Sequence, residues 1–201
     1  MEQPQETVED IIQTPDFPLL RQAGLHLGLW ILAFSLFAAT DSWSQLTGWQ
    51  LASLLNVLTG IAAGFITVNL VHEWFHYLGA KLTSGNYTLK TTPSLFVFDW
   101  NFETNKLNQF YTMSIAGSIG GAVALVAVFN SVDTDSAGRA ALAAGAAASF
   151  AFGSIIEWPV LARTRRSKNP LQELSKITPS VLVRAATGST IIGLISWFAL
   201  T

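Results

Sequence analysis

The sequence predicts an all-α integral membrane protein of about five transmembrane helices, with a short β-hairpin or pair of edge strands between the second and third helices. Half of the 201 residues are hydrophobic and 12% are charged, against roughly 25% charged in soluble domains. The apolar residues are gathered into runs of about 20, the length of helix that crosses a bilayer core of about 30 Å. These two observations exclude a free soluble globule.

Charge and cysteine content exclude several other classes. The net charge is −2, so no basic surplus indicates nucleic acid as a partner. The chain has no cysteine, which excludes disulfides, thiol catalysis and cysteine-ligated zinc. Any bound metal must therefore use histidine and carboxylate ligands.

The first 18 residues carry five carboxylates and no lysine or arginine, which predicts a polar N-terminal tail rather than a signal peptide with its basic start. Residues 19–201 are expected to form a single membrane domain. Its predicted spans are residues 19–40, 51–82, 110–131, 140–161 and 181–200. The second run is longer than one crossing requires, so its last turns are expected to reach the interface or a cavity.

The orientation follows from the lysines and arginines, which are retained on the cytoplasmic side of a membrane. With the N-terminus inside, only Arg139 falls outside. The inner side then collects Arg21, Lys81, Lys90, Lys106, Arg163, Arg165, Arg166, Lys168, Lys176 and Arg184. The sequence thus predicts a cytoplasmic N-terminus and an outer C-terminus, in a prokaryotic inner membrane.

Between the second and third spans, residues 86–102 are rich in Thr, Tyr, Phe and Val and follow a Ser-Gly-Asn turn signal. This composition is typical of a short hairpin at the membrane surface, and the alternative is a loop whose aromatic side chains anchor among the lipid headgroups. Within the spans, the Gly60-x-x-x-Gly64 and Gly117-x-x-x-Gly121 spacings favour close helix packing.

The string His72-Glu73-Trp74-Phe75-His76 contains the pattern HExxH. On a helix, His72 and His76 lie one turn apart on the same face, so both imidazoles can reach one cation. Glu73 flanks that face, where its carboxylate can accept a proton from water rather than bind the metal. Because an ionisable side chain inside a membrane costs roughly 2.5 to 3.5 kcal/mol on insertion scales, such residues are functional or paired by default. The competing interpretation is that these side chains only hydrogen-bond one another and the neighbouring helices.

A catalytic zinc ion usually has three protein ligands, and Glu157 is the predicted third. His76 lies five residues before Lys81 and Glu157 lies six before Arg163, so a rise of about 1.5 Å per residue places both at a similar depth. Glu157 is also the only acidic residue besides Glu73 within the predicted spans. His26, at a comparable depth in the first span, is the alternative ligand. The loop carboxylates Asp99 and Glu103 rank below it, because loop carboxylates are usually solvated.

These residues resemble the site-2 protease family of intramembrane zinc metalloproteases. The resemblance covers residues 57–161. It consists of HEWFHYLGA, a strand-forming segment over residues 87–98, a helix opening with Ser114-Ile115-Ala116-Gly117, and a later span with an acidic residue. Ser118 and Gly121 replace the family's Pro and Asn, and Glu157-Trp158-Pro159 stands where the family has an Asp-Gly motif. The resemblance implies one zinc ion per chain, held by His72, His76 and Glu157.

The expected function is hydrolysis of membrane-embedded protein substrates near the cytoplasmic face, with Glu73 as the catalytic base. The expected partners are a transmembrane protein substrate and the lipid bilayer. The alternative function is a zinc-binding membrane scaffold, or a subunit that binds transmembrane helices without cutting them. A structural site would need the two histidines but would gain nothing from the carboxylate of Glu73.

Overall fold

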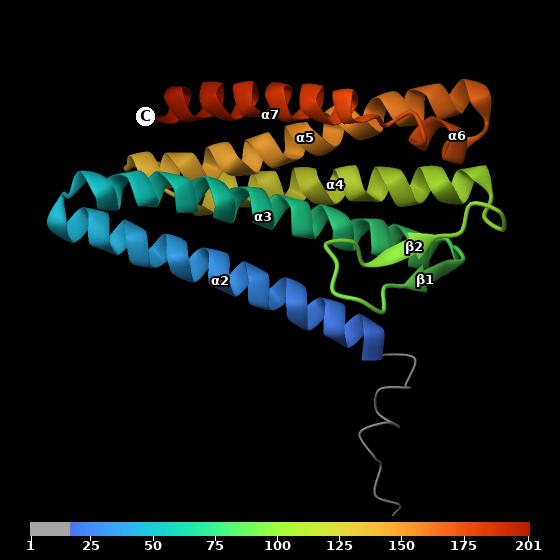
Figure 1. Ribbon diagram of the computed structural model, residues 1–201, viewed down its shortest axis with the longest axis horizontal. Helices are drawn as coiled ribbons and strands as arrows, with labels where there is room; N and C mark the ends of the chain where they lie inside the picture. Colours follow the sequence, from blue (N-terminus) through green and yellow to red (C-terminus); the bar gives the residue numbers. More distant parts are fainter. Residues whose placement is uncertain (1–16) are drawn as a thin grey trace, which may run out of the picture.

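The computed structural model of the protein describes residues 17–201. Its elements are α2 (Phe17–Thr47), α3 (Gln50–Leu82), β1 (Tyr87–Leu89), β2 (Phe98–Trp100), α4 (Leu107–Ser131), α5 (Ala137–Ser167), α6 (Pro170–Leu174) and α7 (Pro179–Leu200) (Figure 1). Within this part of the chain, five helices are long and apolar enough to cross a membrane. The predicted fold class is confirmed.

The helices extend beyond the predicted spans, most clearly α2, which runs to Thr47 rather than to residue 40. The extension contains Asp41, whose carboxylate accepts hydrogen bonds from Asn56 of α3 and Arg139 of α5. Polar partners inside the bundle thus let the helix continue where hydropathy predicts its end. Asp41 is thus an acidic residue within a long helix, and it lies just beyond the end of the first predicted span.

At the other end of α2, the predicted tail of residues 1–18 is too long, because the helix already begins at Phe17. Proline is well suited to the first turn of a helix, where its missing N–H is no loss, and Pro18 lies there. The remainder of the predicted tail, residues 1–16, lies outside the described residues.

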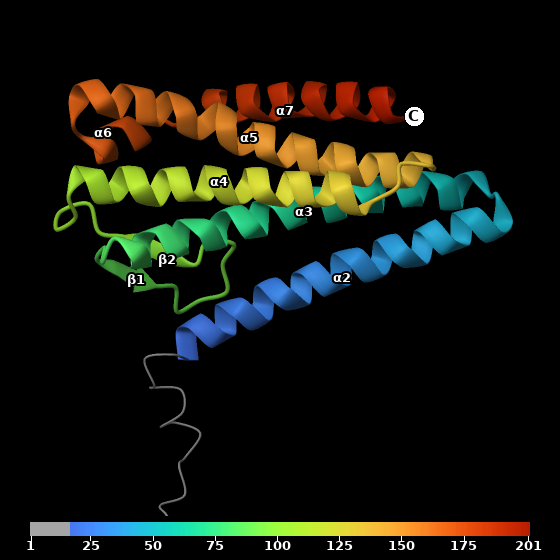
Figure 2. The ribbon, with the colours of Figure 1, turned by 180° about the vertical axis from the view of Figure 1, so that it is seen from behind.

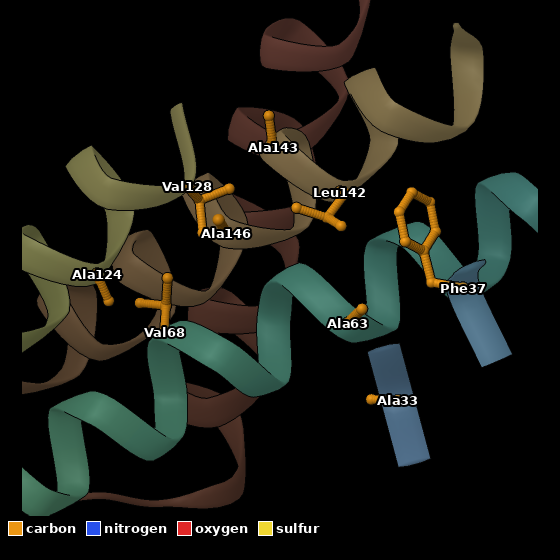
Figure 3. Close-up of a cluster of buried hydrophobic side chains, with 9 residues drawn as sticks. All are labelled: Ala33, Phe37, Ala63, Val68, Ala124, Val128, Leu142, Ala143 and Ala146. Carbon is orange, nitrogen blue, oxygen red and sulfur yellow. The ribbon is translucent and has the colours of Figure 1, made fainter. Parts of the chain in front are cut away.

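Helix α3 is the centre of the bundle and packs against α2, α4 and α5, while α7 packs against α5 (Figures 1 and 2). Small residues bring α3 and α5 close together, as the glycine spacing predicts. A Cβ atom at Gly64 would overlap the backbone carbonyl of Leu142. Figure 3 shows the small and branched side chains of this core, which are Ala33, Phe37, Ala63, Val68, Ala124, Val128, Leu142, Ala143 and Ala146.

The segment between α3 and α4 forms an antiparallel hairpin in which Tyr87 pairs with Trp100 and Leu89 with Phe98. Hydrogen bonds from Lys90 N–H to the Val97 carbonyl and from Asn101 N–H to the Asn86 carbonyl fix the register. By the alternation of an antiparallel ladder, the N–H and C=O groups of Phe98 and Trp100 point away from β1. Within residues 17–201, no strand pairs with this outer edge of β2.

The hairpin lies at the same end of the bundle as α6 and the start of α2, and the C-terminus lies at the opposite end (Figures 1 and 2). Gln22 of α2 donates a hydrogen bond to the carbonyl of Thr92, at 2.7 Å, in the loop between the strands. The buried side chain of Gln22 thereby attaches the loop to α2.

Candidate metal centre

The HExxH pattern lies on α3, where the chain passes between α4 and α5. His72 and His76 are one helical turn apart, and their ring centroids are separated by 4.4 Å. Their Nε2 atoms lie 2.9 Å apart. The two imidazoles therefore direct the same nitrogen toward one point, as the spacing predicts.

Glu157 of α5 reaches the same point from the neighbouring helix. Its Oε1 atom lies 2.8 Å from Nε2 of His72 and 3.0 Å from Nε2 of His76. The hydroxyl of Ser118, on α4, donates a hydrogen bond of 3.2 Å to the other oxygen, Oε2. The structure thus brings together the three side chains predicted as metal ligands, and α5 continues as a helix through Pro159.

The hydrogen-bonding capacity of these three side chains tests whether they suit a metal ion. Nδ1 of His76 lies 2.9 Å from the carbonyl oxygen of Met113, which can only accept, so Nδ1 carries the hydrogen. Nε2 of a neutral His76 then carries no hydrogen and offers a lone pair. Nε2 of His72, Nε2 of His76 and Oε1 of Glu157 form a triangle with three short distances. Two neutral histidines can supply at most one hydrogen to this triangle, so hydrogen bonds cannot account for all three distances.

A divalent cation would satisfy all three lone pairs at once. Two imidazole nitrogens and one carboxylate oxygen are a ligand set typical of catalytic zinc. Donors at about 2.0 to 2.1 Å from a tetrahedral zinc ion lie roughly 3.4 Å apart, so the observed edges of 2.8 to 3.0 Å need to open by only a few tenths of an ångström. The residues present therefore fit a zinc ion.

Glu73 lies beside this triangle, and its carboxylate forms a group with the two histidines in which the ligand atoms are within 4.8 Å of one another. Among the described residues, none donates a hydrogen bond to the carboxylate, which borders a cavity. An unengaged carboxylate next to two metal-ligand candidates can exchange a proton with a water molecule in that cavity.

The cavity has a volume of about 330 Å³ and is lined by both polar and apolar side chains. Glu73, His76 and Glu157 are among its polar lining residues. Phe98 and Trp100 of β2 and Leu174 of α6 are among its apolar ones. Strand β2 and the candidate metal ligands therefore border the same cavity.

The alternative ligand, His26, lies elsewhere. Its Nδ1 atom accepts a hydrogen bond of 3.1 Å from the indole N–H of Trp74, so Nε2 carries the hydrogen and donates to the carbonyl of Ser94 at 2.9 Å. Both ring nitrogens are occupied, and the ring is 3% exposed. His26 joins α2 to α3 and to the hairpin loop, a bridging role that isolated histidines in membranes commonly have.

The two loop carboxylates are also outside the triangle. Asp99 forms an ion pair with Lys90 and lies at the border of the cavity. Glu103 is exposed in the loop before α4. Within residues 17–201, neither carboxylate is hydrogen-bonded to His72 or His76, whereas Glu157 contacts both.

Sequence reasoning did not identify the groups that orient the ligands. Ser118 and the Met113 carbonyl both belong to α4, and so does Gly117, at which a Cβ atom would overlap the imidazole of His76. Gly117 is therefore needed for the ring as well as for helix packing. The only signal in the sequence is that small residues and one hydroxyl lie close together in this segment. That signal does not predict which side chains they contact.

No family model, curated protein or solved structure matches the chain. Membership of the site-2 protease family stays a prediction that rests on the residues quoted above.

Proposed function

We propose that the protein is an intramembrane zinc metalloprotease that cleaves membrane-embedded protein substrates. The observation that carries this proposal is the convergence of His72 Nε2, His76 Nε2 and Glu157 Oε1 within 3.0 Å, beside the unengaged carboxylate of Glu73. A purely structural zinc site would have no use for an unengaged carboxylate at the border of a cavity. We further propose that the site faces the cytoplasmic side, where the basic residues gather.

Three side chains would hold the zinc ion, which supplies Lewis-acid polarisation of the scissile carbonyl and acidifies water. His76 is fixed for this purpose by its Nδ1–H donation to the Met113 carbonyl, and Glu157 by the Ser118 hydroxyl. Such partners of metal ligands set the ring orientation and the basicity of the ligand.

Glu73 would act as the general base and then as the acid. Its carboxylate removes a proton from the attacking water, whose oxygen bonds to the scissile carbonyl carbon. When the carbon–nitrogen bond breaks, the same proton passes from Glu73 to the leaving amine. Water adds across the peptide bond, and Glu73 returns to its starting state.

The unpaired edge of β2 would hold the substrate in an extended form. A helical segment cannot be cleaved while its backbone is bonded within the helix, and an added strand can pair with the exposed N–H and C=O groups of Phe98 and Trp100. The apolar lining of the cavity suits the hydrophobic side chains of a transmembrane substrate.

Replacing Glu73 with Gln tests this role. We expect Glu73→Gln to retain the bound zinc of the wild type, because no ligand is lost, while cleavage of a model transmembrane substrate falls by about 10²- to 10⁴-fold. Glu103→Gln, the same change at an exposed loop carboxylate, is the matched control and should leave both unchanged. Zinc content is measured by mass spectrometry of the metal in purified protein.

Two results would contradict the proposal. A wild-type protein that binds zinc but cleaves none of a broad set of membrane substrates would favour the scaffold function. A protein that stays free of zinc after incubation with the ion would exclude both functions and leave the triangle as a hydrogen-bonded cluster.

A further inference from the structure

A second cavity, of about 340 Å³, is lined by residues of α5, of the segment that follows α6, and of α7. Three cationic side chains, those of Arg163, Lys176 and Arg184, form part of its lining. Apolar groups such as Ile155 and Val181 form the remainder. The cavity thus combines positive charge with a hydrophobic surface.

Only part of this charge is neutralised within the protein. The buried carboxylate of Glu173 accepts hydrogen bonds from Arg163 at 3.0 Å and from Lys176 at 2.8 Å. Arg184 is exposed, and it forms no ion pair within residues 17–201. Three cations against one carboxylate leave two positive charges at the cavity, which would attract an anionic occupant.

The position of Arg184 relates this charge to the membrane. Arg184 lies near the start of α7, and its neighbours Leu182 and Val183 are exposed hydrophobic residues on the outside of the bundle. A cation close to the end of a membrane-spanning helix lies at the level of the lipid headgroups. The apolar lining of the cavity then borders the level of the acyl chains.

We propose that this cavity binds an anionic phospholipid, with the phosphate beside Arg184, Arg163 and Lys176 and an acyl chain against Ile155 and Ile156, which lie deeper along α5 than Arg163. Basic pockets between membrane-spanning helices bind anionic headgroups in this way. A free phosphate ion would match the cations but would leave the apolar lining without a partner. The proposal is independent of the proposed function.

The two cavities share a wall. Ile156 and Ile177 line both the candidate catalytic cavity and the second cavity. A lipid bound at the second cavity would therefore lie one layer of side chains from the first. This places the lipid where it can influence the width of the first cavity without entering it.

Lipid binding to the full chain in detergent tests the proposal, measured by native mass spectrometry with phosphatidylglycerol and phosphatidylcholine of identical chains. We expect the wild type to retain phosphatidylglycerol preferentially. Arg184→Gln should weaken that binding about fivefold, the contribution of one basic residue at a membrane surface, and leave phosphatidylcholine binding unchanged. Arg166→Gln, at an exposed arginine outside the cavity, is the matched control and should bind as the wild type does.

Three outcomes would overturn the proposal. Equal retention of the two lipids would show that charge does not select the occupant. Equal losses for Arg184→Gln and Arg166→Gln would show diffuse attraction rather than a site. Displacement of the lipid by millimolar inorganic phosphate would show an anion site that needs no acyl chain. Circular dichroism of each variant confirms that the helices are intact, so that a loss of binding reports on the cavity.

Discussion

At the scale of single residues, the candidate metal centre is defined by which hydrogen each polar atom carries. The carbonyl of Met113 fixes the tautomer of His76, and the indole of Trp74 fixes that of His26. The first histidine is thereby left with a free lone pair at the site, whereas the second has none to offer. We therefore propose Glu157, whose Oε1 atom lies within 3.0 Å of both Nε2 atoms, rather than His26 as the partner of the two HExxH histidines.

The two candidate ligands can be separated by substitution. We expect Glu157→Gln to lower zinc occupancy, because a neutral amide replaces a carboxylate ligand, while His26→Ala keeps the zinc. His26→Ala should instead lower the free energy of unfolding by about 1 to 3 kcal/mol, since the Ser94 carbonyl loses a buried hydrogen-bond donor. Metal analysis and thermal denaturation of the same preparations distinguish the two effects.

A milder change at the same site tests the partner of Glu157 rather than the ligand itself. Ser118→Ala keeps every proposed ligand and removes only the donor to Glu157 Oε2, so zinc affinity should fall by about 10- to 100-fold. Zinc loss in His26→Ala with full occupancy in Glu157→Gln would reassign the site to His26.

At the scale of elements, hydropathy predicted the number and order of the long helices, because each apolar run is a local property of the sequence. It missed the end of α2, where Asp41 is held by Arg139, a residue 98 positions away. It also missed α6, since five residues carry no helical periodicity. The HExxH spacing was predictable because it lies within one helix, whereas the contacts of Ser118 and Gly117 depend on how α3, α4 and α5 pack.

Helix α6 is attached to α5 by an ion cluster that pH should loosen. Hydrogen bonds from Lys176 and then Arg163 hold the pKa of Glu173 below its ordinary value of 4.5. Because the folded-state pKa is the lower one, the attachment contributes fully above about pH 4.5 and is lost as the pH falls through the folded value. Hydrogen exchange in residues 170–177, corrected for the intrinsic rate, should therefore increase as the pH is lowered from 6 to 3.

Glu173→Gln is the control for this prediction. Its exchange should already be faster at pH 6 and should change little at lower pH. Exchange in the wild type that is constant over this range would show that the ion cluster does not hold α6 in place.

At the scale of the whole molecule, five alternating helices place the start of α2 and the C-terminus at opposite ends of the bundle. The hairpin, α6 and the candidate metal centre all lie toward the end at which α2 starts. The site therefore faces the same side of the membrane as the start of α2. We propose that this is the cytoplasmic side.

Because the chain has no cysteine, single cysteines can report this orientation directly. In intact cells, we expect a membrane-impermeant maleimide to label Thr201→Cys and to leave Glu103→Cys unlabelled until the cells are permeabilised. The reverse labelling would place the site on the outer side of the membrane without changing the bundle.

The unpaired edge of β2 has a consequence for the resting protein. The amides of Phe98 and Trp100 need hydrogen-bonding partners, and hydrocarbon tails provide none. Residues 17–201 offer these groups no partner, so we expect water to bind along this edge of β2. If the protein hydrolyses peptide bonds as we propose, the same water would be available as the co-reactant close to the two histidines.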